Sequence, residues 1–218
     1  YAIYAFCRSV DDLGDEFAGD RTSALDFWEQ EIERCFEDTP SHPYMVALQQ
    51  TIRTFEIPRE PFIKLVQANR MDQTTTRHPT YNDLEFYCRH SANPVGHLVL
   101  YVCGYRDAHR QQLSDFTCTA LQLANFWQDV ARDFAMGRIY IPQEDMERFG
   151  YSEGELAGGV VNQPFRDLMA FEVDRARELF HKGLELVDTL DGRIKLDVGL
   201  FSLGGLKVLD AIERQGYD

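Results

Sequence analysis

Residues 122–142, QLANFWQDVARDFAMGRIYIP, decide how the rest of the chain is interpreted. Asn125, Asp129 and Asp133 recur every four residues, and this spacing places them on one face of an α-helix. Apolar side chains fill the positions alongside. Carboxylates one turn apart repel each other by roughly 0.2–0.5 kcal/mol even on an exposed helix, and burial without a partner costs more. The pattern therefore favours a hard divalent cation held by oxygen ligands.

A second stretch, YAIYAFCRSVDDLGDE at residues 1–16, carries a matching pattern. Asp11 and Asp15 are again four residues apart, and Asp12 stands beside them. Two further residues lie on roughly the same helical face, Tyr4 and Arg8. Two such motifs could face each other across a cavity and hold several Mg²⁺ ions, which keep coordination positions for water and substrate phosphate. The sequence thus predicts a diphosphate ligand; the alternative is two solvated acidic helix faces.

Length and charge narrow the classes of protein. The 218 residues suffice for one globular, soluble domain over 1–218 with a sizeable core. Formal charge is −14, from 22 basic and 36 acidic residues, which argues against a nucleic-acid partner. An acidic protein that handles an anionic substrate needs metal ions or local arginines. Because the chain opens at Tyr1 in the middle of a pattern, we expect an N-terminal segment to be missing.

Cysteine usage and hydropathy indicate the compartment. The five cysteines form no C-x-x-C pair, and they read as small buried residues in a reducing compartment, so a cytoplasmic location is expected. No run of about 18 apolar residues predicts a spanning helix, and no signal peptide is apparent. A transient membrane-surface contact through an apolar cavity mouth is a further hypothesis.

Periodicity predicts an all-α protein. No stretch alternates with the period of two that a strand requires. A second helix is expected to be capped by Thr22 or Ser23, and Pro94 is expected to interrupt a later one. The other expected helices cover residues 1–15, 44–55, 61–71, 81–103, 111–134, 164–190 and 198–216. Loops are expected over 72–79, 137–150 and 153–162.

Four motifs together resemble the squalene/phytoene synthase family of class I isoprenoid synthases. They are YAIYAFCRSVDDLGD, YCRHSANPVG at 87–96, QLANFWQDVARDFAMGRIYIP, and the C-terminal LDAIERQGYD. The resemblance covers essentially the whole chain. It implies a single helical bundle around a deep hydrophobic cavity, in which prenyl diphosphates are condensed or rearranged with Mg²⁺.

Within the family, NFWQDV and SANPVG are most similar to the bacterial hopanoid branch. That similarity implies ionisation of presqualene diphosphate and quenching by water to hydroxysqualene, with no nicotinamide cofactor. The implied partners are the prenyl diphosphate substrate and other enzymes of the same pathway.

The resemblance also assigns roles to residues. The implied metal ligands are Asp11, Asp12, Asp15, Asn125, Asp129 and Asp133. The implied diphosphate contacts are Tyr4, Arg8, Gln122 and Arg138. The implied catalytic set is Asp11, Asp15, Tyr87, Asn125, Asp129 and Asp133. Candidates to stabilise a carbocation are Phe6, Tyr87, Phe126, Trp127 and Phe201, although aromatic residues are more often plain core. The alternative for Arg8 and Arg138 is an ordinary ion pair with nearby carboxylates.

Two positions depart from the family pattern. Many relatives carry arginine where this chain has Gln128, which removes a cationic contact to phosphate and argues against condensing two substrates. The last helix often carries a tyrosine near Gly205. The alternatives are head-to-head condensation of two farnesyl or geranylgeranyl diphosphates, and a non-catalytic subunit. The first motif also suits head-to-tail prenyltransferases and terpene cyclases, but residues 122–142 do not resemble theirs.

Overall fold

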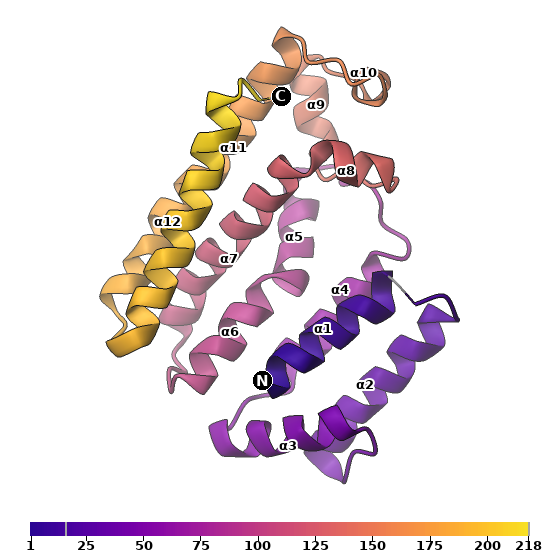
Figure 1. The fold of residues 1–218 in the computed structure, drawn as a ribbon, viewed down its shortest axis with the longest axis vertical. Helices are drawn as coiled ribbons and strands as arrows, with labels where there is room; N and C mark the ends of the chain where they lie inside the picture. Colours follow the sequence, from indigo (N-terminus) through magenta and orange to yellow (C-terminus); the bar gives the residue numbers. More distant parts are fainter. Residues whose placement is uncertain (16, 218) are drawn as a thin grey trace. The chain divides into compact units, whose positions relative to one another are not determined.

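Helices connected by short loops make up the computed structural model, which describes residues 1–15 and 17–217, with Asp15 described by its backbone alone. The helices are α1 Ala2–Asp15, α2 Arg21–Glu37, α3 Pro43–Phe55, α4 Glu60–Met71, α5 Tyr81–Ser91, α6 Asn93–Val102, α7 Ala108–Gln128, α8 Val130–Ala135, α9 Gln143–Phe149, α10 Glu153–Ala157, α11 Gln163–Asp188 and α12 Gly192–Arg214 (Figure 1). Across these described residues no strand forms, and a single isolated bridge pairs Arg77 with Ile139. The all-α prediction is confirmed.

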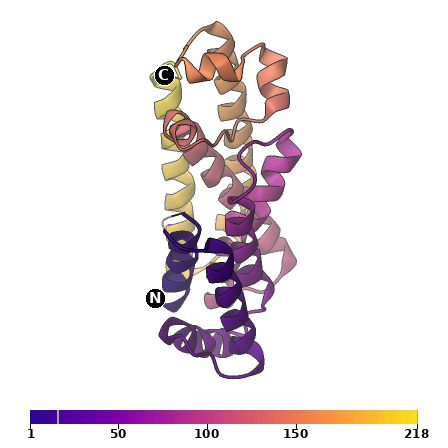
Figure 2. The ribbon, with the colours of Figure 1, turned by 90° about the vertical axis from the view of Figure 1, so that its right-hand side faces the viewer.

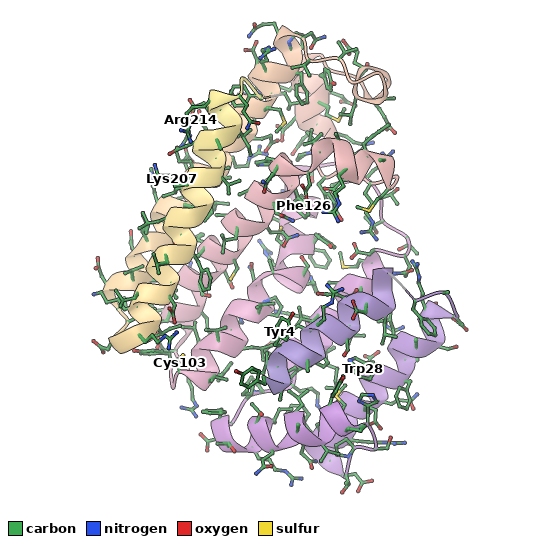
Figure 3. All side chains as sticks on the ribbon, in the orientation of Figure 1. Tyr4, Trp28, Cys103, Phe126, Lys207 and Arg214 are labelled. Carbon is green, nitrogen blue, oxygen red and sulfur yellow. The ribbon has the colours of Figure 1, made fainter. Side chains whose placement is uncertain are left out.

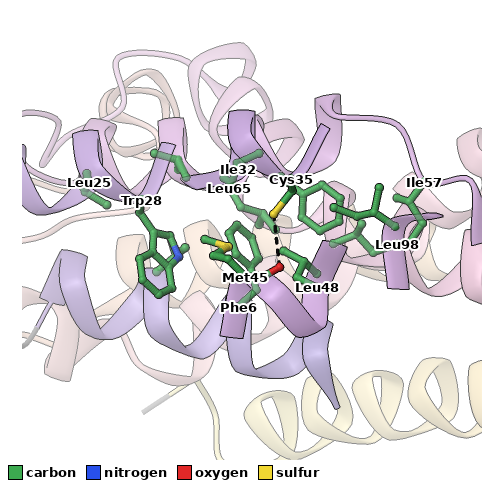
Figure 4. Packing of buried hydrophobic residues seen from close by; sticks show 14 residues of the cluster. Phe6, Leu25, Trp28, Ile32, Cys35, Met45, Leu48, Ile57, Leu65 and Leu98 are labelled. Atoms are coloured by element: carbon green, nitrogen blue, oxygen red, sulfur yellow. Dashed lines mark hydrogen bonds between the residues drawn. The ribbon is translucent and has the colours of Figure 1, made fainter. Parts of the chain in front are cut away.

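The chain divides into two compact units, and each is described by itself. Unit 1 comprises Tyr1–Thr75 and Arg89–Asp107, and unit 2 comprises Thr76–Cys88 and Ala108–Asp218. In unit 1, α1 packs against α2, α3 and α4, and α4 packs against α6. Figure 4 shows its core, where the Cys35 thiol donates to the Met45 carbonyl oxygen at 3.4 Å amid buried apolar side chains. Burial of these side chains is the main force that orders the unit.

Helix α1 is amphipathic, and its apolar face belongs to the core of unit 1. Phe6 and Val10 are fully buried, and the Phe6 ring meets Phe62 edge-on with ring centres 5.3 Å apart. Tyr4 lies on the opposite face and is 72% exposed (Figure 3). The Gly14 carbonyl oxygen, near the end of α1, accepts a hydrogen bond from the Gln73 side-chain amide at 3.0 Å. The burial of one face therefore leaves the polar face of the first motif outside this core.

In unit 2, helix α11 packs against both α7 and α12 (Figure 1, Figure 2). Two glycines allow these helices to approach closely. A Cβ at Gly183 would lie 2.9 Å from the Thr117 backbone nitrogen, and a Cβ at Gly205 would lie 2.7 Å from the Phe180 Cε1. Gly205 therefore serves helix packing in this chain.

Several expected boundaries were wrong. The expected helix over 111–134 is interrupted at Asp129, which separates α7 from α8. The cap of α2 is Asp20, whose carboxylate accepts from the Ser23 amide at 3.1 Å. The last helix begins at Gly192 instead of 198. Short helices occupy parts of both predicted loops, α9 within 137–150 and α10 within 153–162. The break near Pro94 is confirmed, because α5 ends at Ser91 and α6 begins at Asn93.

None of the helices described here combines the length and the apolar character needed to cross a membrane.

Gly204 and Gly205 are adjacent in α12 but have opposite surroundings, so they make a matched pair of substitutions. A Cβ at Gly204 would meet nothing within 4 Å, and Gly204→Ala should stabilise the fold by about 0.5–1 kcal/mol through helix propensity. Gly205→Ala should destabilise it by about 1–3 kcal/mol, because the buried Phe180 ring must move. Urea-denaturation midpoints measure both effects; equal effects of the two variants would contradict the close approach.

Candidate active site

The second aspartate motif lies at a break in a helix of unit 2. α7 ends at Gln128, and Asp129 adopts φ −106° and ψ 15° before α8 begins. The four-residue spacing survives the break, since the Asp129 amide donates to the Asn125 carbonyl at 3.0 Å and the Asp133 amide donates to the Asp129 carbonyl at 2.8 Å. Asn125 is exposed, and Gln122 one turn earlier is half-buried. The motif therefore keeps the geometry of successive turns without being one straight helix.

The charge of this motif is only partly balanced. Burial and the neighbouring Asp129 carboxylate raise the pKa of Asp133 to about 6, against the opposing effects of Arg138 and Arg132. Arg132 lies 3.5 Å from an Asp129 carboxylate oxygen, but its side chain is 74% exposed, so the pair contributes little. Two neighbouring carboxyl groups, with an amide oxygen one turn away, are a donor set that fits Mg²⁺. The residues present thus suit the metal that the sequence predicts.

An aromatic cluster adjoins this motif in unit 2. The Phe126 and Tyr140 rings stack with centres 3.7 Å apart and planes 8° apart, and the Tyr87 ring centre lies 6.3 Å from that of Phe126. His78 stacks on Tyr140 at 5.7 Å, and burial lowers its pKa, which favours the neutral imidazole. Tyr87 is 6% exposed and belongs to this cluster. Such a wall offers aromatic faces close to the motif.

The first aspartate motif lies on α1 in unit 1. Tyr4, Arg8 and Asp11 are exposed, on the face opposite the buried Phe6. Arg8 forms an ion pair with Asp12, with Nη2 2.7 Å from Oδ1 and both side chains about half exposed. Both readings of Arg8, ion-pair partner and phosphate ligand, therefore stay open. The side chain of Asp15 lies outside the described residues.

Asp12 also borders a cavity of about 430 Å³ in unit 1. The other lining residues are Ser9, Leu13, Phe17, Trp28, His42 and Tyr44. Its role as a metal ligand stays a prediction, and the Arg8 contact shows that it already has a cationic neighbour.

In the described part of the chain, no three His, Cys, Asp or Glu side chains are grouped closely enough to hold a metal ion by themselves. Each unit contributes its own motif, and their joint action on a metal stays a prediction. Among the aromatic candidates, Phe6 is core, whereas Phe201 is 61% exposed on α12. The Trp127 indole donates to the Glu172 carbonyl at 3.2 Å, which fixes it as a packing residue between α7 and α11.

A larger cavity of about 610 Å³ lies in unit 2, beside α8 and the C-terminal part of α12. Gln128 lines it together with apolar side chains that include Phe134 and Met169. Its lining does not include Asn125, Asp129 or Asp133. Gln128 therefore borders a space that the side chains of the second motif do not line.

Sequence reasoning missed a buried charged cluster that supports the second motif from α11. Arg175 contacts Glu172 and Asp145, each at 2.8 Å, and its guanidinium lies over the Tyr81 ring at 4.1 Å. Glu172 is fully buried, and this burial raises its pKa to about 8 despite the opposing effect of Arg175; the charge of Asp145 raises it further. Glu172 and Arg175 are three residues apart on α11, but no spacing in the sequence joins them to Asp145 on α9 or Tyr81 on α5.

The helical fold, the two aspartate motifs and the aromatic wall define an all-α enzyme of the class that acts on prenyl diphosphates. The family model for squalene/phytoene synthase matches residues 1–218, and the chain belongs to that family. The enzyme class predicted from the sequence is therefore confirmed.

Three relatives illustrate the similarity. A crystal structure of squalene synthase HpnC from Alicyclobacillus acidocaldarius is 49% identical, with a TM-score of 0.98, and the match covers 100% of this chain and 83% of that one. A dehydrosqualene synthase crystallised with a ligand is 28% identical, with a TM-score of 0.89 and coverage of 100% and 76%. The 15-cis-phytoene synthase of Synechococcus elongatus is 33% identical, with coverage of 100% and 75%.

The buried Glu172 predicts how stability depends on pH. The folded state holds the Glu172 proton until about pH 8, whereas the unfolded chain releases it near the ordinary value of 4.5. Between these values the folded state binds more protons, so stability should fall as pH rises, by up to about 1.4 kcal/mol per pH unit. Below the lower value this contribution is fully present.

Glu172→Gln should flatten that decline, because the amide does not titrate. Urea denaturation of the variant and the parent between pH 5.5 and 8.5 measures the slopes. The matched control is Glu178→Gln, an exposed position on the same helix, which should keep the parental slope. Parallel curves for Glu172→Gln and the parent would show that Glu172 is ionised throughout.

Proposed function

We propose that this protein is a Mg²⁺-dependent enzyme of squalene and hopanoid biosynthesis that ionises presqualene diphosphate and adds water to give hydroxysqualene. The observation that carries the proposal is the second motif, where crowded carboxylates at a helix break adjoin a wall of aromatic rings. The 49% identity to squalene synthase HpnC supports the choice of branch within the family.

The proposed roles follow from the chemistry of each side chain. Asp11, Asp15, Asp129 and Asp133, supported by Asp12 and Asn125, would hold magnesium, which when bound supplies Lewis-acid stabilisation of the leaving diphosphate. Tyr4, Arg8, Gln122 and Arg138 would bind and orient the diphosphate through hydrogen bonds and charge.

The reaction would begin when the carbon–oxygen bond of the substrate breaks and the diphosphate leaves with the electron pair. The remaining carbocation needs surroundings without competing water, and the faces of Tyr87 and Phe126 would lower its energy. The cyclopropane ring of this cation would open as its carbon–carbon bonds rearrange. A water molecule held by Asn125 would then add its oxygen to the rearranged cation and release one proton to the solvent, which completes the alcohol. No redox step is involved, so no nicotinamide cofactor is required.

Phytoene synthase relatives at 33% identity support a second candidate, the head-to-head condensation of two prenyl diphosphates. The neutral Gln128, where many relatives carry arginine, favours the single-substrate reaction. Contact with partner enzymes and with a membrane surface belongs to the same proposal, since the product would be lipid-soluble.

A product assay tests the proposal. The protein is incubated with Mg²⁺ and without reductant, and presqualene diphosphate and farnesyl diphosphate are offered separately. Hydroxysqualene should form from presqualene diphosphate alone, and chelation by EDTA should abolish turnover until Mg²⁺ is restored. Asp129→Ala should lower the rate by roughly a hundredfold or more, because charge stabilisation on the leaving group is lost.

The other outcomes assign the alternatives. A 30-carbon or 40-carbon product made from the shorter diphosphates would identify a condensing synthase. Turnover that persists at the full rate in EDTA would contradict the proposed dependence on Mg²⁺. If neither substrate is turned over and Asp129→Ala does not change Mg²⁺ binding, the result would favour the alternative that the protein is a non-catalytic subunit.

A further inference from the structure

The segment 76–80 of unit 2 runs alongside the loop that follows the second motif. The Ile139 amide donates to the Thr76 carbonyl at 3.0 Å, and the Gln143 amide donates to the His78 carbonyl at 2.9 Å. The two stretches also share the isolated parallel bridge between Arg77 and Ile139. This pairing fixes the loop that carries Arg138 to a backbone far away in the sequence.

Arg77 adds side-chain contacts at the same place. Its Nη1 donates to the Gly137 carbonyl at 2.7 Å and to the Thr76 carbonyl at 2.8 Å. Its Nε donates to Glu153 at 3.2 Å, and Nη2 forms an ion pair with the same carboxylate. The Arg77 side chain is only 26% exposed, and it lowers the pKa of Glu153 by hydrogen bonding and charge. A guanidinium is suited to this task, because its planar fork can serve several acceptors at once.

One peptide group is held from both ends by these contacts. The carbonyl of Gly137 accepts from Arg77, and the amide of the next residue, Arg138, donates to the Asp133 carbonyl at 2.9 Å. Gly137 has φ +83°, a conformation that favours glycine, and it closes α8. The orientation of this peptide determines the direction in which the Arg138 side chain leaves the backbone.

We propose that Arg77 is a positioning residue, which holds the Gly137–Arg138 peptide so that the Arg138 guanidinium is directed to the diphosphate. The inference rests on the proposed function, since Arg138 is the group that would bind the diphosphate. All the contacts of Arg77 described above are with other groups of the protein. Loss of Arg77 would let the peptide rotate, and Arg138 would then lose order before binding.

Binding of inorganic pyrophosphate in the presence of Mg²⁺, measured by calorimetry, tests the inference without turnover. Arg77→Met should weaken binding about tenfold, the equivalent of one hydrogen bond to a charged group. Arg77→Lys keeps a donor for the Gly137 carbonyl and should lie between the parent and Arg77→Met. In an Arg138→Met background, Arg77→Met should cause little further loss, because both substitutions remove the same interaction.

Arg177→Met is the matched control. Arg177 is 24% exposed and also pairs with carboxylates of unit 2, Asp174 and Glu213, but it contacts no part of the loop over 137–142. Circular dichroism confirms that each variant is folded at the temperature used. The control should bind pyrophosphate as the parent does.

Three results would overturn the inference. Parental affinity in Arg77→Met would show that Arg138 needs no such support, while the proposed function would stand. Equal losses in Arg77→Met and Arg177→Met would indicate general loosening of unit 2. Absence of pyrophosphate binding by the parent would count against the proposed diphosphate site, and the positioning role would fall with it.

Discussion

Repulsion between two carboxylates one turn apart is the constraint on which the second motif depends. Asp129 and Asp133 lie one turn apart although burial, and then the Asp129 charge, make ionisation of Asp133 unfavourable. In a helix with no function at these positions, replacing either aspartate by an uncharged residue would increase stability. If this pair holds metal as proposed, activity and stability oppose each other at this position, as they do where charged groups are retained for function.

The surroundings of the motif supply the rigidity that such a repulsive arrangement needs. Arg77 and the pairing of residues 76–80 hold the loop that follows the motif. The hydrogen bond from Trp127 to α11 holds the helix that precedes it. Arg175 contacts both Glu172 and Asp145, and because burial keeps Glu172 protonated up to about pH 8, the charge of the arginine is matched by Asp145 alone. Buried charged networks of this kind favour one arrangement of helices, even when their net contribution to stability is small.

Much of the architecture was readable from the sequence because local signals determine helices. Apolar periodicity predicted the helical class, and Pro94 marked the boundary between α5 and α6. The pattern Ser152-x-x-Glu155 is a capping box and could have predicted α10, which was instead expected to be irregular. By contrast, the break at Asp129 has no local signal, because the backbone hydrogen bonds continue through it and no glycine or proline is present.

The parts of the site that escaped prediction depend on contacts between distant residues. Asp129 and Asp133 could be proposed from their spacing, whereas the partners of Arg77 are 60 and 76 residues away.

The same separation in sequence affects the order of folding. Helical contacts form early because they are local, and the pairing of 76–80 with 139–144 must wait for a long loop to close. A chain newly released from the ribosome could thus show its full helical content while Arg138 is not yet in place.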